Sequence, residues 1–280
     1  MAEITATAVG KLRAMTNAGF MDCKKALTET GGDLEAAVDV LRKKGVASAA
    51  KKAGRSANEG VIAHYISPDS KSGTLVEVNC ETDFVAKNET FREFCNQVAK
   101  ALVKSPDTEI EEMRAAQVAK IGENIQIGRR TRMDVSGTGM IAAYIHTGAK
   151  IGVLVEVGAN NASSIGDEQF AGLVKDITLQ IAAANPVAVR RDEIDPAIVR
   201  KEKEIAEDQA RGKPPQAIAK IIEGKLAKYY QNTCLEDQGF IRQNGEVTVK
   251  EHIASVGKEM GDEFVVRRFL RFQIGEGEQE

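Results

Sequence analysis

The sequence predicts an α+β protein in which a small helical bundle precedes a duplicated α+β core. Three observations support this class. Helical apolar patterns fill about the first 45 residues, residues 60–102 repeat as residues 139–181 with 13 identities in 43 positions and no gap, and two proline-marked helical runs interrupt the second copy. A constant offset of 79 residues indicates an internal duplication. We therefore expect the core to consist of two related units.

The first segment has the spacing of three short helices. One face of the first helix presents the apolar residues Ile4, Ala8, Leu12 and Met15. The second helix begins at Asp22 and ends at the pair Gly31-Gly32. Asp33 caps the third, which is expected to end at Gly45. The inner face of that helix consists of Leu34, Ala37, Val38 and Leu41. A basic, alanine-rich connector follows over residues 48–56.

Each copy of the repeat reads as two strands joined by a turn and followed by a helix. The aligned strand segments are residues 60–66 with 139–145 and residues 73–78 with 152–157. They are short and rich in β-branched residues, which favours strands. The helices are expected over residues 88–104 and 167–185. Because short turns join the strands of a pair, small antiparallel sheets are expected.

A third strand is expected to complete each copy, over residues 124–133 in the first and 263–272 in the second. The second copy holds about 60 more residues before this strand. The insertion contains two helical runs, residues 196–211 and 215–230, with proline near the start of each. We expect a helical hairpin whose two arms pack through Ile198, Ile205, Ile218, Ile221, Ile222 and Leu226.

Composition excludes several classes of function. A formal net charge of −3 argues against duplex nucleic acid as the main ligand. No stretch has the roughly 20 apolar residues of a membrane span, and neither a phosphate-binding loop nor a dinucleotide fingerprint occurs. The start, Met1 to Thr5, lacks the regions of a signal peptide, and four widely spaced cysteines suit a reducing compartment. We expect a cytoplasmic protein without a cofactor or metal of its own.

The isolated histidines and cysteines are expected to have structural rather than catalytic roles. No nucleophile in a recognisable local motif accompanies His64 or His252, so a packing or surface role is expected for both. Cys23 and Cys95 fall on apolar helix faces and Cys80 ends a strand. Buried, unreactive thiols are the expectation for all three.

The two copies differ most after their second strand. The first copy has Thr82-Asp83-Phe84-Val85 at this corner, whereas the aligned residues 161–164 are small and polar. An aromatic residue beside a charge is typical of an anchor that binds another protein. Alternatively, Thr82 or Asp83 caps a short helix that buries Phe84 locally. The sequence leaves both readings open.

A similar choice concerns Phe20 and Met21, which are expected in the turn between the first two helices. Two large apolar residues are more than a turn requires. Phe20 could fill the small core of the bundle, or both residues could form an exposed docking patch.

At these segments the chain resembles a known family. Residues 12–27 and 77–87 resemble two signature segments of the bacterial translation elongation factor Ts family. The resemblance continues through residues 120–125, 144–155 and 274–277 and covers essentially the whole chain. It implies a ubiquitin-associated-like three-helix domain over residues 1–46, a linker over 47–59, core subdomains over 60–136 and over 137–185 plus 246–280, and a helical-hairpin dimerisation insert over 186–245.

The resemblance also implies a function. Members of this family act as guanine nucleotide exchange factors for the GTPase elongation factor Tu, so the chain is expected not to be an enzyme. By this resemblance, Mg²⁺ in the partner is displaced by Thr82, Asp83, Phe84 and Val85. GDP then leaves and GTP can rebind. The partner would be bound by Arg13, Phe20, Met21 and His146. The hairpin would permit a homodimer, and neither nucleic acid nor a membrane is an expected partner.

Two other functions stay open at this level. A translation-associated adaptor would use the bundle to bind helices and would exchange no nucleotide. A cysteine-dependent enzyme would need a reactive thiol such as Cys80. GDP release from the partner separates the adaptor from the exchange factor, and a Cys80→Ser variant tests the enzyme.

Overall fold

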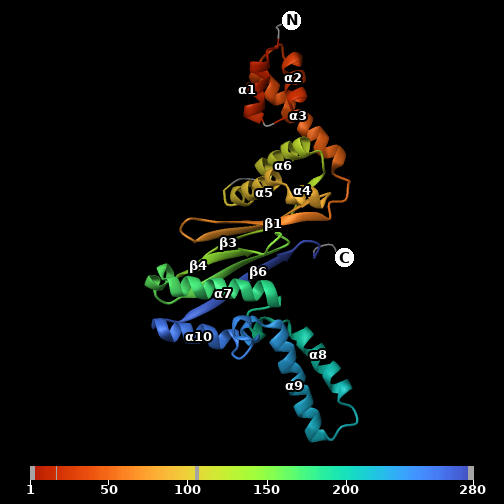
Figure 1. Ribbon diagram of the computed structural model, residues 1–280. Coiled ribbons are helices and arrows are strands. Elements are labelled where there is room, and N and C mark those ends of the chain that lie inside the picture. The colour runs from red at the N-terminus through yellow and green to blue at the C-terminus, as the bar shows by residue number, and fades with distance from the viewer. Residues whose placement is uncertain (1–3, 17, 105–106, 277–280) are drawn as a thin grey trace.

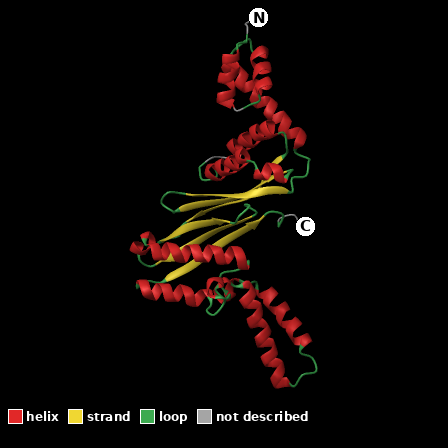
Figure 2. Ribbon diagram, in the orientation of Figure 1, coloured by secondary structure: helices red, strands yellow, loops and turns green. Residues whose placement is uncertain are grey.

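The structure, a computed structural model, describes residues 4–16, 18–104 and 107–276. Residues 1–3 of the N-terminal segment that was examined for a signal peptide lie outside the described residues, as does Gly277 of the segment 274–277 that carries part of the family resemblance. Figures 1 and 2 show an elongated molecule with a helical bundle at one end and a helical hairpin at the other. Between them lie two three-stranded antiparallel sheets, in the orders β1-β2-β3 and β4-β5-β6. The predicted α+β class is confirmed.

The bundle consists of α1 (Ala6–Thr16), α2 (Phe20–Glu29) and the first part of α3 (Leu34–Lys52). Asp33 caps α3 as expected, since its side chain accepts a hydrogen bond from the Ala36 N–H at 3.0 Å. Met15 was expected on the inner face, but its side chain is 58% exposed and Val9 is buried instead. The small core of the bundle contains Val9, Leu12, Cys23, Ala26, Leu27 and Ala37.

Helix α3 does not end at Gly45, as the sequence led us to expect, but continues to Lys52. Gly45 is buried where α3 packs against α6 (Asp107–Ile121), and a Cβ there would lie 3.5 Å from the Ala115 carbonyl oxygen. This is an ordinary van der Waals distance, so the contact does not require a glycine, and Gly45 is an interior residue of a helix that continues past it. Ala49, in the last turns of α3, belongs to the core of the first α+β copy. The domain boundaries stay a prediction.

The two α+β copies have the same order of elements. The first contains β1 (Glu59–Ile66), β2 (Ser72–Cys80), α4 (Asp83–Lys87), α5 (Glu89–Ala101), α6 and β3 (Ile125–Asp134). The second contains β4 (Gly139–Ile145), β5 (Ile151–Ala159), the 3₁₀ turn η1 (Ala162–Gly166), α7 (Glu168–Ala184), α10 (Val249–Met260) and β6 (Phe264–Gln273). The expected strands and helices are confirmed within a few residues. Sequence reasoning missed α6 and α10, each of which leads into the third strand of its copy.

Each sheet packs one face against the other sheet and the opposite face against helices (Figure 2). Helices α5 and α6 cover the first sheet, and α7 and α10 cover the second. Phe91 on α5 and Phe170 on α7, which the repeat aligns, are both fully buried between these helices and the sheets. The cluster between the sheets consists of Ile62, Leu75, Met133, Ile141, Leu154 and Phe272.

The first hairpin turn of each copy crosses onto the other copy. The Ser70 carbonyl accepts a hydrogen bond from the Ile141 N–H at 2.8 Å, and the Ala149 carbonyl accepts one from the Ile62 N–H at 2.7 Å. Ser70 and Ala149 both have left-handed backbone, with φ of 55° and 58°. The two contacts are equivalent under the repeat offset, so the copies exchange matching contacts.

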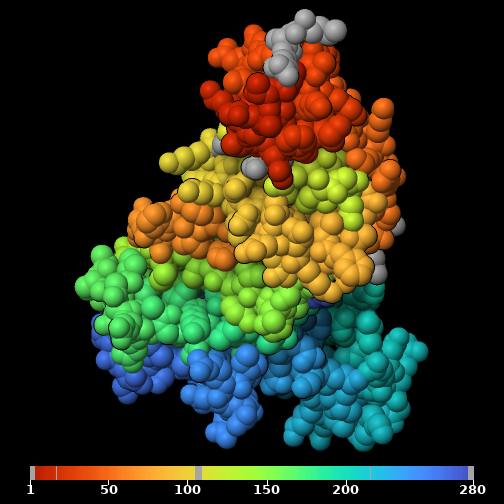
Figure 3. All heavy atoms as spheres, turned by 45° about the horizontal axis from the view of Figure 1, so that its top comes forward, coloured from red at the N-terminus to blue at the C-terminus, as the bar shows by residue number. Residues whose placement is uncertain are grey.

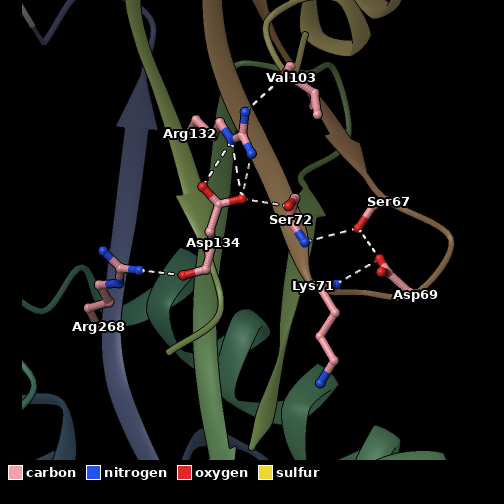
Figure 4. Close-up of polar contacts among 8 residues, drawn as sticks. All are labelled: Ser67, Asp69, Lys71, Ser72, Val103, Arg132, Asp134 and Arg268. Atoms are coloured by element: carbon pink, nitrogen blue, oxygen red, sulfur yellow. Dashed lines mark hydrogen bonds and ion pairs between the residues drawn. The ribbon is translucent and has the colours of Figure 1, made fainter. Parts of the chain in front are cut away.

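Polar side chains reinforce the first of these turns (Figure 4). Ser72 Oγ donates to Asp134 Oδ1 at 2.6 Å, and Arg132 Nη1 donates to the Val103 carbonyl at 2.6 Å. The Asp134 carbonyl accepts a bond from Arg268 Nη2 of the second copy at 2.8 Å. Asp134 therefore joins the end of β3 to the β1–β2 hairpin and to β6.

Two glycines let the sheets approach each other. A Cβ on Gly73 would lie 2.6 Å from Ile141 Cγ2, and a Cβ on Gly152 would lie 2.4 Å from Ile62 Cγ2. Neither distance leaves room for a methyl group. The repeat aligns these glycines, so the same close approach occurs twice.

The insertion forms the expected hairpin from α8 (Pro196–Gln209) and α9 (Pro215–Thr233). Ile198 and Ile205 were expected between its arms but are 46% and 41% exposed, whereas Ala206 and Ala210 are buried. The base of the insertion belongs to the core, since it contributes Val189 and Leu235. Around it lie the 3₁₀ turns η2 (Arg191–Glu193), η3 (Leu235–Asp237) and η4 (Ile241–Gln243). None of the described helices is long and apolar enough to cross a membrane.

Candidate functional site

The corner after β2 is a capped short helix. Thr82 is the N-cap of α4, and its Oγ1 accepts a hydrogen bond from the Val85 N–H at 3.3 Å. A threonine in this position satisfies one of the backbone donors that a helix start leaves without partners. The capping part of the alternative reading is therefore confirmed.

Phe84 is not buried by this short helix. Its side chain is 81% exposed, whereas Ala86 on the same helix is 3% exposed and Val85 packs partly on the core of the first copy. The expectation that the cap buries Phe84 is wrong. The corner instead presents an aromatic ring to solvent from a firmly seated base, and we call residues 82–85 the wedge.

Asp83 and Lys87 form an ion pair beside Phe84. Lys87 Nζ lies 2.6 Å from Asp83 Oδ2, four residues apart on α4. The hydrogen bond from Lys87 lowers the pKa of the Asp83 carboxyl. Both side chains are exposed, so this pair adds little to stability. It keeps a negative charge next to the exposed ring.

The wedge is tied to the start of β3 by residues that sequence reasoning missed as parts of the site. Glu123 accepts hydrogen bonds from the Glu81 N–H and the Thr82 N–H, each at 3.1 Å. The Asn124 N–H donates to Glu81 Oε1 at 2.6 Å. These residues belong to the run Gly122-Glu123-Asn124, within a segment that carries the family resemblance. The sequence signal that could have pointed to them is a polar run directly before an apolar strand.

The matching corner of the second copy has no comparable tip. Its residues form the 3₁₀ turn η1, and Asn161 makes no side-chain cap. Ser163 stands at the position aligned with Phe84 and is exposed. The copies therefore share the scaffold of the corner but differ in what it presents.

The bundle presents an exposed apolar patch. Phe20 and Met21 lie in the first turn of α2 rather than in the turn before it, and their side chains are 47% and 58% exposed. Phe20 therefore does not fill the core of the bundle. Arg13 on α1 is also exposed. We call Arg13, Phe20 and Met21 the bundle patch.

Helix α6 connects the bundle to the wedge (Figure 1). A groove of about 420 Å³ separates the α1–α2 turn from α6, with Gly19 on one side and Ala116 and Lys120 on the other. The end of α6 then leads into Glu123 beneath the wedge. Figure 3 shows the bundle standing over the helices of the first copy.

His146 lies in the tight turn between β4 and β5 and is exposed. Its Nδ1 is 3.1 Å from the Tyr144 hydroxyl oxygen. The same turn crosses to the first copy, where Lys150 pairs with Glu59, the residue opposite Cys80 in the β1–β2 register. His146 and the wedge are therefore at the same end of the core.

The other histidines lie away from this end or have no catalytic partner among the described residues. His64 is exposed on β1. His252 on α10 stacks on Phe240 with ring centroids 4.0 Å apart, and its buried Nε2 makes no hydrogen bond in the described structure. Burial lowers the pKa of His252, although Asp176 Oδ2 lies 3.7 Å away.

The described cysteines are poor nucleophiles. Cys23, Cys80, Cys95 and Cys234 are all buried and free. Burial, with the nearby Glu123 charge, raises the pKa of Cys80 to about 12, so its thiol stays protonated at neutral pH. A cysteine-dependent reaction at this corner is not favoured. Over the described part of the chain, no three His, Cys, Asp or Glu side chains gather as a metal site would require.

Comparisons with known proteins agree on one family. The family described as Elongation factor TS matches residues 81–276. A protein of Nitratidesulfovibrio vulgaris strain DP4 named Elongation factor Ts is 43% identical over 281 residues, which cover 98% of this chain and 96% of that protein. Proteins of the same name from Clostridium perfringens strain SM101 and Syntrophotalea carbinolica are 43% and 44% identical, over 98% of this chain and 94% of each relative.

Proposed function

The chain belongs to the elongation factor Ts family, and we propose which of its residues carry out the function of that family. It is a translation elongation factor that acts as the guanine nucleotide exchange factor of elongation factor Tu. The adaptor without exchange activity is not favoured. The roles of individual residues below are our proposal.

Exchange follows from selective binding of the nucleotide-free partner. If the chain binds elongation factor Tu more tightly when GDP and Mg²⁺ are absent, then by linkage it weakens their binding by the same factor. No bond is made or broken, and we propose that the chain is not an enzyme. The surface needs only groups that fit the partner best after Mg²⁺ has left.

We propose that the wedge supplies these groups, with Phe84 as the anchor. The observation that carries this proposal is the 81% exposure of Phe84 on a helix whose next residues are packed into the core. Burying a phenylalanine side chain contributes about 1.5–3 kcal/mol. A rigid base lets most of this free energy act on the partner rather than on ordering the wedge. Loss of Mg²⁺ then leaves the diphosphate charge uncompensated, and GDP leaves faster.

Asp83, Thr82 and Val85 have supporting roles in this proposal. Asp83 places a negative charge beside Phe84, and the hydrogen bond from Lys87 lowers the pKa of its carboxyl further. Thr82 caps α4, and Val85 seats it on the core. Together they fix the direction in which Phe84 points.

The bundle patch and His146 are proposed as further contacts with elongation factor Tu. The exposed Phe20 and Met21 on α2 offer apolar surface, and the exposed Arg13 on α1 offers a positive charge. His146 lies at the same end of the core as the wedge, because its turn crosses onto β1. Contacts on both sides of the wedge would hold the GTPase while Phe84 inserts.

The hairpin is proposed as a homodimer contact, since α8 exposes Ile198 and Ile205. Sedimentation of a variant lacking residues 196–232 tests this, and unchanged self-association would contradict it. We further propose a cytoplasmic location and no direct role for nucleic acid or a membrane.

The experiment that tests the function is stopped-flow release of a fluorescent GDP from elongation factor Tu. Adding the chain should accelerate release in proportion to its concentration until the partner is saturated. An unchanged release rate, despite binding to elongation factor Tu, would support the adaptor instead.

A further inference from the structure

Beneath the wedge, one carboxylate accepts three hydrogen bonds. Glu123 Oε2 accepts from the backbone N–H groups of Glu81 and Thr82, each at 3.1 Å, and Glu123 Oε1 accepts from the Thr82 hydroxyl at 2.7 Å. Hydrogen bonds to an ionised acceptor are about twice as strong as neutral ones. Glu123 comes from the start of β3, 41 residues further along the chain than Thr82.

We propose that Glu123 is a positioning residue for nucleotide exchange, which acts by fixing the wedge. This inference rests on the proposed function of Phe84. Glu123 is only partly exposed beneath the corner, and its bonds are to the residues before Phe84, so its effect passes through the backbone of the corner.

The Thr82 hydroxyl transmits this effect to α4. It donates its hydrogen to Glu123 and accepts from the Val85 N–H at 3.3 Å, so both of its roles are occupied. Glu123 thus holds the hydroxyl with a lone pair toward the start of α4. Without this acceptor, the hydroxyl can rotate and the cap of a five-residue helix weakens. Phe84 would then sample several directions before binding, and part of its binding free energy would be spent on ordering the wedge.

The second copy contains the same device without a wedge. Asp262, which follows the helix-ending Gly261 as Glu123 follows Gly122, accepts from the Asn160 N–H at 3.1 Å, the Asn161 N–H at 3.2 Å and Ser164 Oγ at 2.6 Å. Asn160 and Asn161 align with Glu81 and Thr82. A carboxylate that clamps this corner is therefore a property of the fold, and only the first clamp supports an exposed aromatic tip.

A second set of bonds ties the Glu123 clamp to the bundle. Asn124, the next residue, is fully buried and its Nδ2 donates to the Arg55 carbonyl at 2.7 Å, just beyond α3. Arg55 Nη1 lies 3.4 Å from Glu81 Oε1. These bonds therefore fix the wedge relative to the end of α3, the helix that joins the bundle to the core, as well as relative to the sheet.

The test compares Glu123→Gln with the matched control Asp262→Asn in the full chain. Each substitution replaces a carboxylate by an amide of the same shape. We expect similar losses of thermal stability, but only E123Q should slow GDP release from elongation factor Tu, by about tenfold, the value of one charged hydrogen bond. Equal exchange by E123Q and wild type, or equal slowing by both variants, would overturn the proposal.

A double variant separates this proposal from the proposed function. If Glu123 acts through Phe84, then E123Q should slow release little further in a Phe84→Ala background. Additive effects would overturn the positioning role. If F84A alone exchanges like wild type, the wedge itself fails. If F84A is slow but E123Q is not, only the positioning role fails.

Two more measurements guard against a trivial loss of folding. Amide hydrogen exchange at Glu81 and Thr82 should become faster in E123Q while β2 residues such as Val76 stay protected. Glu123→Asp keeps the charge and should recover part of the exchange rate, as Asp262 shows that a shorter carboxylate can fill the role. Unchanged protection at Thr82, or an E123D variant slower than E123Q, would contradict the proposal.

Discussion

The two α+β copies fold alike but present different surfaces to a partner. Both bury an aligned phenylalanine, Phe91 and Phe170, and both clamp the corner after their second strand with a carboxylate. At the tip of that corner the first copy exposes Phe84, whereas the second has Ser163. The comparison teaches that both copies have a corner held by a carboxylate, whereas the aromatic tip to which we assign the displacement of Mg²⁺ belongs to the first copy.

The largest effect should come from removing that tip. Asp83→Ala with Phe84→Ala should slow stimulated GDP release by about 30-fold or more, because truncating a central aromatic anchor costs about 2–4 kcal/mol. Thermal stability should change little, since both side chains are exposed. The control is Ser163→Ala at the aligned position of the second copy, which should exchange like wild type. A double variant that loses stability but exchanges normally would show that the wedge is only structural.

The shared scaffold should respond equally in both copies. Gly73→Ala and Gly152→Ala each push a methyl group into an isoleucine of the other copy, so each should lower the free energy of unfolding by about 1–3 kcal/mol. Urea denaturation measures this. A large loss at one position and none at the other would contradict the matching contacts between the copies.

The bundle patch should have a smaller effect than the wedge. Phe20→Ser with Met21→Ser should raise the concentration of the chain needed for half-maximal exchange by about five- to tenfold, as expected for two contacts that together are worth about 1–1.4 kcal/mol. The rate at saturation should change less. Val187→Ser, at an exposed apolar residue outside the bundle, is the control. A patch variant with the wild-type concentration dependence would remove the bundle from the proposed interface.

The smallest effect concerns pH. Under the offset of 139 residues that pairs Gly122 with Gly261, His252 of the second copy stands where the first copy has Met113. Burial lowers the pKa of this histidine, the charges of Asp176 and Glu259 oppose that shift, and Arg242 adds to it. The unfolded state therefore binds the proton more readily, so stability should fall as the pH drops below about 6.5. His252→Gln should flatten that part of the profile, measured by thermal melts from pH 7.5 to about 5. An identical slope in wild type and variant would exclude this contribution.

The repeat predicted the sheets well because its identities fall on strand residues that pack. Gly73, Leu75 and Val76 match Gly152, Leu154 and Val155, and these positions are buried in both copies. Helix α6 was missed although Ile110, Met113, Val118 and Ile121 have helical spacing. The reason is that its counterpart α10 stands at a different offset, behind the insertion.

Local patterns failed where packing between distant segments decides. Gly45 was expected to end its helix, but α3 continues through it and packs there against Ala115 of α6. The cap at Thr82 could be predicted from its side chain, whereas the exposure of Phe84 depends on which neighbours the fold leaves beside it. The Glu123 clamp joins residues 41 positions apart, and no local spacing indicates it.

The most direct test of the wedge uses Mg²⁺ as the variable. Fluorescent GDP release from elongation factor Tu is measured by stopped flow with wild type and with Phe84→Ala, first in Mg²⁺ and then after its chelation. If Phe84 acts by displacing Mg²⁺, the variant should be much slower than wild type in Mg²⁺, and chelation should reduce the difference between them. Equal rates in Mg²⁺, or a difference that chelation leaves unchanged, would contradict the proposed role of the wedge.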